Sequence, residues 1–552
     1  MLGTFHGGLK LPSHKALSIR TTIADAPAPD KVVIPVRQHI GQAADVLVKV
    51  GEQVGKGQKI AAAEGYISAP VHASISGTVT AIENRHAPHP SGLKTLCIEI
   101  ESDGKDQWAS ERPEKIADYR SLDALQLRNL LRDAGIVGLG GAAFPTSVKL
   151  NPGAIGHIHT VIINGAECEP FITCDDVLMQ EHAPEIISGI QIIQHMLEPE
   201  RVLVGIEDNK PLAIAIMQQI LEESDATNVE IIAVPSIYPT GGERQLIKVL
   251  TDQEVPSKGL PANLGITCHN VGSVLAIHNA IVKGEPLIDR VVTVAGGGIA
   301  QPQNIRVRLG TLFPEVIALA GGYTEAANHL IMGGPMMGIS LSHDDMPVIK
   351  ATNCLLIAAQ HEIKQPTQSM PCIRCGQCAD VCPAQLLPQQ LHWFARAGDY
   401  DKIQEYNLFD CIECGCCDYV CPSHIPLVQY YRHAKTEIWL EEKQALKSNI
   451  ARDRFEFREA RLERKKREKA ERLAKKRAAL KAKNDSKEDP KKKAIQAALA
   501  RAKAKAKQEA RDSAPANTNN LTAEQKRQID EADARRKLAS EADQANNSEG
   551  SP

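Results

Sequence analysis

Two short cysteine-rich segments constrain this chain more than any other feature of its sequence. The first reads Cys372-Ile-Arg-Cys375-Gly-Gln-Cys378-Ala-Asp-Val-Cys382-Pro, and the second, at 411–422, has the same spacing. Both follow the pattern C-x2-C-x2-C-x3-C-P, which holds [4Fe–4S] clusters in bacterial ferredoxins. Three thiolates at intervals of three residues can bind three corners of a cubane, and the fourth corner needs a cysteine from elsewhere.

The cysteine before the proline completes the other cluster in two-cluster proteins of this kind. We therefore predict two ligand sets that exchange this residue. Cluster 1 takes Cys372, Cys375, Cys378 and Cys421, and cluster 2 takes Cys382, Cys411, Cys414 and Cys417. Cys416 falls out of register, and we interpret it as a thiol beside cluster 2 that is not a ligand.

Zinc and disulfides are the alternatives for so many cysteines. Structural zinc sites usually show C-x2-C pairs separated by a longer gap, and zinc needs neither a third cysteine nor the trailing proline. Disulfides belong to exported proteins, and the first residues show no basic-then-apolar export signal. This part of the chain is therefore expected to transfer single electrons.

Length and composition indicate a multidomain protein of a reducing compartment. The chain has 552 residues, enough for several domains, and 14 cysteines, of which the clusters use eight. No apolar run approaches the roughly 18 residues of a membrane span. The net charge of −3 conceals an asymmetry, because the segment after about Ala445 is rich in Lys and Arg and the part before it must be acidic.

Residues 31–100 alternate β-branched residues with glycines, which predicts short strands joined by tight turns. The pattern V-x-x-G-x-x-V-x-x-G-Q-x-I resembles the barrel-sandwich (lipoyl-like) fold. Such domains carry a modifiable lysine on a hairpin tip, and the corresponding segment 64–73 has none. We therefore predict a structural or docking role for this domain.

A glycine-rich loop at 138–146 follows a helical pattern at 121–134. Gly135 is suited to end that helix, and Pro145 to begin a new one toward Lys149. Glycines before a helix N-terminus let backbone N–H groups approach a phosphate. The loop follows a helix and a dinucleotide fingerprint should follow a strand, so a plain helix–helix turn remains open.

Apolar runs at 160–163, 201–205 and 229–234 alternate with helical stretches near 181–197 and 210–222, which predicts a parallel sheet. Ligands of such sheets bind beyond the carboxyl ends of the strands. Polar segments follow at 164–170, 238–243 and 267–272. Together with the glycine loop they indicate a binding site.

These four segments resemble the NADH-binding subunit of respiratory complex I. Residues 138–149 are similar to its flavin loop, 164–170 to its N-A-D-E-S-E-P element, 238–243 to its Y-x-x-G-E-E, and 267–270 to its T-x-N-N. Residues 289–338 resemble the β-grasp domain that follows in that family.

The order of the domains resembles that of the RnfC family, the C subunits of the bacterial Rnf (or Rsx) electron-transport complexes. The opening Phe5-His-Gly-Gly-Leu-Lys-Leu-Pro12 is also similar to that family's N-terminus. The resemblance covers about 1–440 and implies a multidomain α+β fold. The expected parts are a barrel-sandwich domain at 1–105, an α/β FMN/NADH-binding domain at 115–285, a β-grasp (SLBB-like) domain at 286–345, a helical two-cluster ferredoxin domain at 362–440, and a basic tail at 445–552 that is first helical and then disordered.

The resemblance implies non-covalent FMN as cofactor and NADH as substrate. FMN would be held by Gly138, Gly140, Gly141, Lys149, Asn164, Gly241, Gly242 and Asn270. Its ring would be lined by Glu167, Tyr238 and Glu243, while Phe144 would stack on the nicotinamide nucleotide and Glu169 would bind its ribose. Ala166, Gly242 and His269 stand where the complex I pattern has Asp, Glu and Asn. Restoring Asp at position 166 should therefore change flavin affinity or potential.

The family implies a peripheral NADH-oxidising subunit on the cytoplasmic face of the bacterial inner membrane. Its partners would be the other subunits of a Na⁺- or H⁺-translocating complex and a ferredoxin-like protein. The catalysis belongs to the cofactor, and no acid or base residue is assigned. The alternative is a non-catalytic relay or scaffold subunit that uses only the clusters. The basic tail is typical of a solvated helix; we expect it to help hold the chain near a membrane, and we do not expect nucleic acid as a partner.

Overall fold

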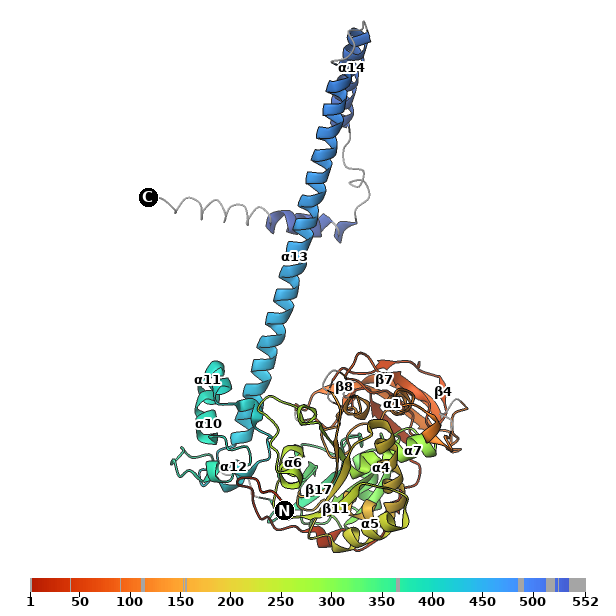
Figure 1. Cartoon of the computed structure of the whole chain (residues 1–552), viewed down its shortest axis with the longest axis vertical. Coiled ribbons are helices and arrows are strands. Elements are labelled where there is room, and N and C mark those ends of the chain that lie inside the picture. The colour runs from red at the N-terminus through yellow and green to blue at the C-terminus, as the bar shows by residue number, and fades with distance from the viewer. Residues whose placement is uncertain are drawn as a thin grey trace. The chain divides into compact units, whose positions relative to one another are not determined.

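The computed structural model describes residues 2–39, 41–89, 91–110, 115–151, 153, 156–363, 368–484, 491–512, 522–524 and 526–535. The chain divides into two compact units, Met1–Lys443 and Gln444–Pro552 (Figure 1). The predicted cofactor-binding domains all lie in the first unit. Short 3₁₀ turns occur at Lys15–Leu17, Tyr119–Ser121, Pro261–Leu264 and Leu408–Asp410.

The N-terminal domain is a sandwich of two antiparallel sheets. One sheet has the order β2 (Lys31–Pro35), β8 (Lys94–Ser102), β7 (Gly77–His86), β4 (Gln53–Val54). The other has the order β3 (Asp45–Val46), β5 (Lys59–Ala62), β6 (Val71–His72). A Cβ atom on Gly77 would lie 1.9 Å from the carbonyl oxygen of Glu101, so glycine is required where β7 begins to pair with β8.

The α/β domain contains the predicted parallel sheet, in the order β11 (Val229–Val234), β10 (Arg201–Glu207), β9 (Thr160–Gly165), β12 (Ile266–Asn270). The three apolar runs are confirmed as strands, and β12 adds a fourth. The helices are α1 (Ala124–Asp133), α2 (Thr146–Lys149), α3 (Cys174–Glu181), α4 (Ala183–Leu197), α5 (Pro211–Glu223), α6 (Glu243–Thr251) and α7 (Val271–Val282). Of these, α3, α6 and α7 were not predicted.

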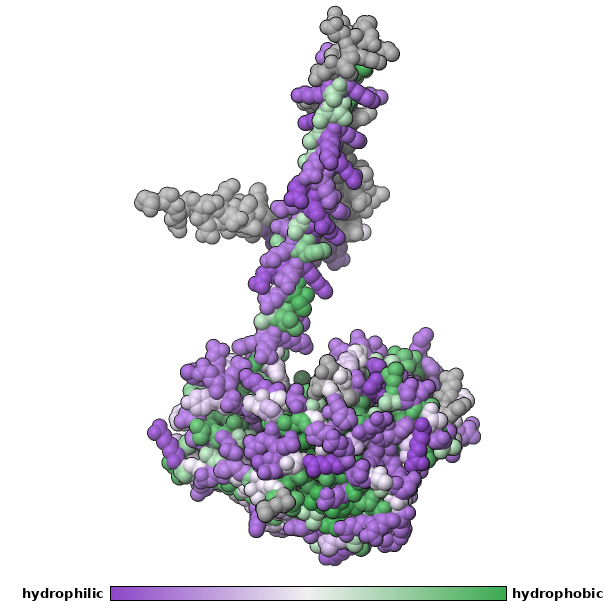
Figure 2. All heavy atoms as spheres, in the orientation of Figure 1, coloured by the Kyte–Doolittle hydropathy of each residue, from purple (hydrophilic) through white to green (hydrophobic). Residues whose placement is uncertain are grey.

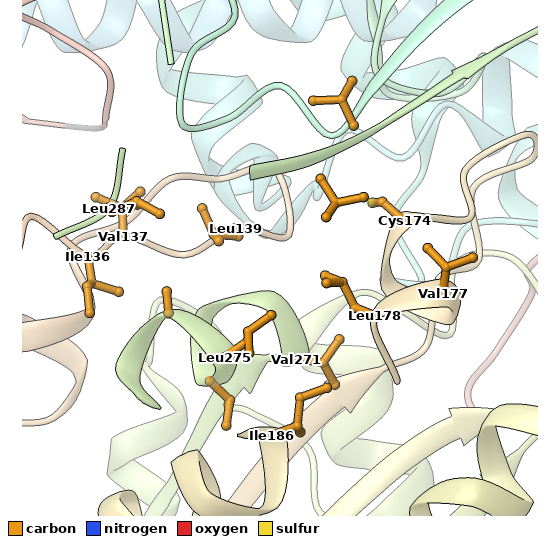
Figure 3. Close-up of a cluster of buried hydrophobic side chains, with 14 of the residues drawn as sticks. Ile136, Val137, Leu139, Cys174, Val177, Leu178, Ile186, Val271, Leu275 and Leu287 are labelled. Carbon is orange, nitrogen blue, oxygen red and sulfur yellow. The ribbon is translucent and has the colours of Figure 1, made fainter. Parts of the chain in front are cut away.

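The glycine loop is anchored by apolar side chains at its start. Val137 and Leu139, which enter the loop, lie in the same buried cluster as Leu275 of α7 and Leu178 of α3 (Figure 3). Gly135 ends α1 with a φ of +70°, as its position in the sequence predicted. The backbone at the start of the loop is therefore fixed by the burial of Val137 and Leu139.

The next domain is a six-stranded mixed sheet, β1 (Ala24–Asp25), β14 (Gln303–Arg308), β13 (Asp289–Ala295), β17 (Cys354–Ala359), β15 (Ala327–Met332), β16 (Ile339–Leu341), with helix α8 (Phe313–Leu319). Strand β17 pairs with both β13 and β15 and is buried along its whole length. It lies beyond residue 345, where the sequence placed the end of this domain.

The ferredoxin domain is built from α9 (Gln377–Asp380), α10 (Pro388–Ala397), α11 (Tyr400–Glu405), α12 (Cys416–Val420) and the first turns of α13 (Leu427–Asn484). Leu391, Ile403 and Tyr431 form its core. The hydroxyl of Tyr431 donates a hydrogen bond to the carbonyl oxygen of Pro388 (2.6 Å), which joins α13 to the start of α10.

The second unit contains the rest of α13 and α14 (Lys491–Asp512). Its surface is largely hydrophilic, with scattered apolar side chains such as Leu473 and Leu480 (Figure 2). The expected break at Asp489-Pro490 lies outside the described residues, as do 513–521 and 536–552 of the stretch expected to be disordered, while 526–535 are helical. Among the described residues, no helix is long and apolar enough to cross a membrane.

Truncation tests the division into two units. A chain ending at Lys443 keeps Tyr431, Ala434 and Ile438 in the ferredoxin core, so its Tm should stay within about 2 °C of the full chain, with unchanged iron content. A chain ending at Pro426 loses these side chains and should lose iron. Thermal unfolding and iron analysis measure both effects, and a loss of iron on truncation after Lys443 would contradict the division.

Candidate flavin site and cluster sites

Three segments predicted to bind FMN meet at the carboxyl end of the parallel sheet. Asn164, at the end of β9, donates from Nδ2 to the carbonyl oxygen of Gly241 (2.9 Å). Its Oδ1 accepts from the N–H of Ala166 (3.0 Å). Asn164 therefore joins the segment after β9 to the segment after β11, and its amide is used in shaping the site.

Lys149 and Glu243 form an ion pair across the site. The Lys149 Nζ atom lies 2.6 Å from Glu243 Oε1 and 3.0 Å from the carbonyl oxygen of Cys268. Burial lowers the pKa of Lys149, but the Glu243 carboxylate more than offsets this and the pKa is raised overall. Lys149 is therefore a fixed positive charge, suited to an anionic group of a cofactor.

The glycine loop lies against the end of β12. Its turn is closed by the N–H of Gly138, which donates to the carbonyl oxygen of Phe144 (2.7 Å). A Cβ atom on Gly140 would lie 3.4 Å from the side chain of Asn270. In the described part of the chain, the N–H groups of Gly140 and Gly141 have no protein acceptor. The loop thus presents free donors and little side-chain bulk, which fits a phosphate or flavin oxygen.

The start of α6 also brings backbone without side-chain bulk to the site. Gly242 is its N-cap residue, and a Cβ atom there would lie 2.5 Å from Gln245 Oε1. The ring of Phe144 is half-buried beside the glycine loop. The residues present therefore fit FMN, through a fixed cation, free N–H donors and glycines at points of close approach.

Asn270 is oriented by a buried carboxylate that the sequence did not single out. Its Nδ2 donates to Asp175 Oδ2 (2.6 Å), and its Oδ1 accepts from the N–H of Gly272 at the start of α7 (2.9 Å). Burial, and then the charge of Glu167, raise the pKa of Asp175 to about 7. In the sequence, Asp175 is indistinguishable from an ordinary acid in the first turn of a helix.

Glu167 lies in the interior behind the site. Its Oε1 accepts from the N–H of Asp175 (2.8 Å), while its Oε2 has no partner among the described residues. Its carbonyl oxygen and those of Glu169 and Ile172 accept hydrogen bonds from Lys15 Nζ at 2.5–3.0 Å. A lysine from the N-terminal segment thus fixes the segment that follows β9.

Glu169 was expected to bind the ribose of NADH, but in this structure its carboxylate is already occupied. It accepts hydrogen bonds from the N–H groups of Met336 (3.2 Å) and Met337 (2.7 Å) in the loop between β15 and β16. Burial raises the pKa of Glu169 to about 7, although these two donors oppose the shift. Contact with a ribose would need these bonds to be exchanged.

Tyr238 was expected to line the flavin, and the structure places its hydroxyl against the ferredoxin domain. The hydroxyl donates to the carbonyl oxygen of Cys414 (2.6 Å), and its ring is buried. We call the surrounding contact the junction; it comprises Tyr238, Cys414, Cys416, Leu9, Leu11, Cys168, Met336, Val381 and Ile412. Cys416 is fully buried there and acts as a small apolar side chain.

The three positions that depart from the complex I pattern have separate surroundings. Ala166 packs in the apolar cluster with Ile162 and Leu203. Gly242 caps α6. His269 is buried, and its Nε2 lies 3.1 Å from Thr267 Oγ1. Burial lowers the pKa of His269 to about 3, so its imidazole is neutral.

The cysteines surround two cavities in the groups that the sequence predicted. Cys372, Cys375, Cys378 and Cys421 line one cavity. Cys382, Cys411, Cys414 and Cys417 line the other, which Cys416 also borders. Both loops use the same backbone, with positive φ at Arg374 and Gly376 in the first and at Glu413 and Gly415 in the second. This grouping supports the proposed ligand sets, because each cavity is bordered by four thiols able to hold four irons.

The buried state of Glu169 generates a pH prediction. Its pKa is about 7 in the folded protein against an ordinary 4.5. The contribution of Glu169 to the free energy of unfolding is therefore fully present below about pH 4.5. It is lost as the pH rises through about 7. Between about pH 5 and pH 7, the free energy of unfolding of Glu169→Gln should fall by about 1–3 kcal/mol less than that of the wild type.

Thermal unfolding at the two pH values measures this effect. Glu325→Gln, at an exposed carboxyl, is the control and should behave as wild type. Equal pH dependence in Glu169→Gln and wild type would show that the Glu169 carboxyl is not buried as described.

Comparison with known families assigns four parts of the chain. Residues 3–105 match the RnfC barrel sandwich hybrid domain, 131–279 the Nuo51 FMN-binding domain, 291–340 the SLBB domain and 371–425 the 4Fe–4S dicluster domain. Together with the geometry above, these matches confirm the predicted fold class and make FMN and two [4Fe–4S] clusters the cofactors of this chain.

A comparison of lower similarity adds nothing to this assignment. The crystal structure of an NAD⁺-reducing [NiFe]-hydrogenase in the air-oxidized state is 16% identical and covers 53% of this chain and 60% of that chain. The TM-score is 0.40, which supports no conclusion.

Curated relatives are similar over most of the chain. The C subunit of the ion-translocating oxidoreductase complex of Pseudomonas aeruginosa is 49% identical over 85% of this chain and 60% of its own length. That of Yersinia pestis is 48% identical over 84% of this chain and 74% of its own length. The chain thus spans about three fifths to three quarters of these relatives. With this identity, coverage and domain content, the chain belongs to the RnfC family, the C subunits of ion-translocating oxidoreductase complexes.

Proposed function

We propose that this chain is the NADH-oxidising subunit of a membrane-bound, ion-translocating electron-transport complex. It passes electrons between NADH and a ferredoxin-type partner through FMN and two [4Fe–4S] clusters. The observation that carries this proposal is the junction, in which the flavin-binding domain and the loop of cluster 2 share one buried contact. The names of the relatives, which call them subunits of ion-translocating oxidoreductase complexes, support the ion-translocating context.

Bound FMN supplies the conversion between the two-electron chemistry of a nicotinamide and the one-electron chemistry of iron–sulfur clusters. The protein supplies position and charge. Lys149 offers a fixed cation to an anionic group, and the glycine loop offers the N–H groups of Gly140 and Gly141. Asn270 is held in one orientation by Asp175 and Gly272.

Fewer contacts support the proposed binding of NADH than support the binding of FMN. Phe144, half-buried beside the glycine loop, offers an aromatic face for the nicotinamide nucleotide. Glu169 would bind the ribose only after releasing the N–H groups of Met336 and Met337. We therefore expect the loop between β15 and β16 to shift when NADH binds.

The junction supports an order in which electrons pass the two clusters. The Tyr238 hydroxyl contacts the carbonyl group of Cys414, a proposed ligand of cluster 2, and Cys168 lies in the same contact beside the N–H of Gly241 (3.3 Å). No ligand of cluster 1 belongs to this set of described residues. We infer that electrons pass between the flavin site and cluster 2, and then between cluster 2 and cluster 1.

We expect the protein to work at the cytoplasmic face of a bacterial inner membrane, bound to the other subunits of a complex that moves Na⁺ or H⁺. The absence of a spanning helix among the described residues fits a peripheral position. The exposed basic helix of the second unit offers positive charge for membrane contact.

A second candidate is a relay subunit that uses only the clusters. It is favoured by the three altered positions, since Ala166 and Gly242 remove two acidic groups of the complex I pattern and His269 is a neutral imidazole. In that case the flavin fold would be a scaffold.

Anaerobic addition of NADH to the purified protein separates the two candidates. We expect the flavin absorbance band to bleach and iron–sulfur signals to appear in electron paramagnetic resonance, because both cofactors belong to one contact network. Lys149→Met should lower FMN content, and Lys94→Met, at an exposed position on β8, should not. Clusters that sodium dithionite reduces but NADH does not would reject the dehydrogenase and leave the relay.

A further inference from the structure

The two cluster loops are built on the same backbone, but their surroundings differ. In the loop of cluster 2, Ile412 belongs to the junction, and Glu413 forms ion pairs with Arg432 (2.8 Å) and Lys435 (2.8 Å). Cys414 is buried. The rest of the body thus covers the outer side of this loop.

The equivalent side of cluster 1 is open. Ile373 is 68% exposed, and Cys375 is the one proposed cluster ligand that is exposed, whereas the others are buried or half-buried. Arg374, which stands where the second loop has Glu413, forms no ion pair within the described residues. Trp393, at the position equivalent to Arg432, is 43% exposed. Arg374 and Trp393 line one surface hollow together with Gly376, Gln389 and Gln390.

We propose that this surface, the cluster-1 face (Ile373, Arg374, Cys375, Gln390 and Trp393), is the docking site for a small electron-transfer protein with an acidic surface around its redox centre. The proposal rests on the proposed function, because it assigns the outer end of the electron path. The junction closes the path at cluster 2, so electrons enter or leave the chain at cluster 1.

The composition of the cluster-1 face fits such a partner. Trp and Arg are enriched at the centres of protein interfaces, and Ile373 adds exposed apolar surface beside Cys375. Arg374 carries a cation without an ion-pair partner among the described residues, so its complement is a carboxylate of the partner. Redox complexes of this kind have small interfaces, and one aromatic anchor with one cation is in keeping with that size.

Binding of a small acidic 2[4Fe–4S] ferredoxin to the full chain with its cofactors tests the proposal. Calorimetry gives the Kd at low ionic strength, and stopped-flow mixing gives the rate of electron transfer after reduction by dithionite. Arg374→Glu and Trp393→Ala should each weaken binding and slow transfer about tenfold or more. Raising the ionic strength from about 0.01 M to about 0.15 M should weaken wild-type binding more than that of Arg374→Glu.

Matched controls lie elsewhere on the body. Trp439→Ala removes a tryptophan that is 56% exposed and packs beside Phe409, and Lys94→Glu makes the same charge change on β8. Both should bind and transfer as wild type does. Reduction of a small neutral acceptor should be equal in wild type, Trp393→Ala and the two controls, and their cluster signals after dithionite should be unchanged.

Three results of the binding measurements would overturn the proposal. They are wild-type binding by both Arg374→Glu and Trp393→Ala, equal losses in the control variants, or no ferredoxin binding by the wild type. A shift from dimer to monomer in the face variants would assign the surface to a second copy of this chain and would also overturn it. Dithionite reduces the clusters without NADH. A failure of NADH to reduce them would therefore reject the proposed function and not the docking site.

Discussion

The buried junction between Tyr238 and the loop of Cys414 is the contact on which the rest of the arrangement depends. It joins the domain that binds a two-electron cofactor to the domain that binds one-electron clusters. An N-terminal strap, residues 6–15, reinforces it. The N–H of Gly8 donates to the carbonyl oxygen of Val381 (3.0 Å), Leu9 pairs with Tyr238, and Lys15 holds the segment after β9. Loss of these contacts would leave two folded domains without an electron path.

Behind the flavin site, the charged side chains lie in the protein interior and not at the surface. Asp175 and Glu167 are buried together, and the nearby guanidinium of Arg290 donates to the carbonyl oxygens of Leu139 and Lys350 and not to either carboxylate. Burial, and then the charge of Glu167, raise the pKa of Asp175 to about 7, which favours the neutral form of its carboxyl. Asn270 connects this buried pair to the glycine loop.

Sequence reasoning was most effective where a local pattern determines structure. The cysteine spacing predicted two cluster loops, and the thiols surround two cavities in the expected groups. The apolar runs predicted β9 and β10, because strands buried on both faces read as continuous apolar runs. They also predicted β11, an edge strand of which only Val234 is buried. Cys416 borders the cavity of cluster 2, in keeping with the interpretation of its spacing. Its burial against Tyr238 could not be predicted, because Tyr238 lies more than 150 residues earlier in the chain. Asp175 and the bonds of Glu169 escaped prediction for the same reason, since their partners come from distant parts of the chain.

Removing one cluster at a time tests the central claim, that electrons from the flavin site reach cluster 1 only through cluster 2. Cys414→Ala removes a proposed ligand of cluster 2, and Cys375→Ala removes one of cluster 1. The remaining cluster in each variant is first shown to be intact by its dithionite-reduced resonance signal. After NADH is added, we expect cluster 2 to be reduced in Cys375→Ala and cluster 1 to stay oxidised in Cys414→Ala. Reduction of cluster 1 at the wild-type rate in Cys414→Ala would contradict the claim.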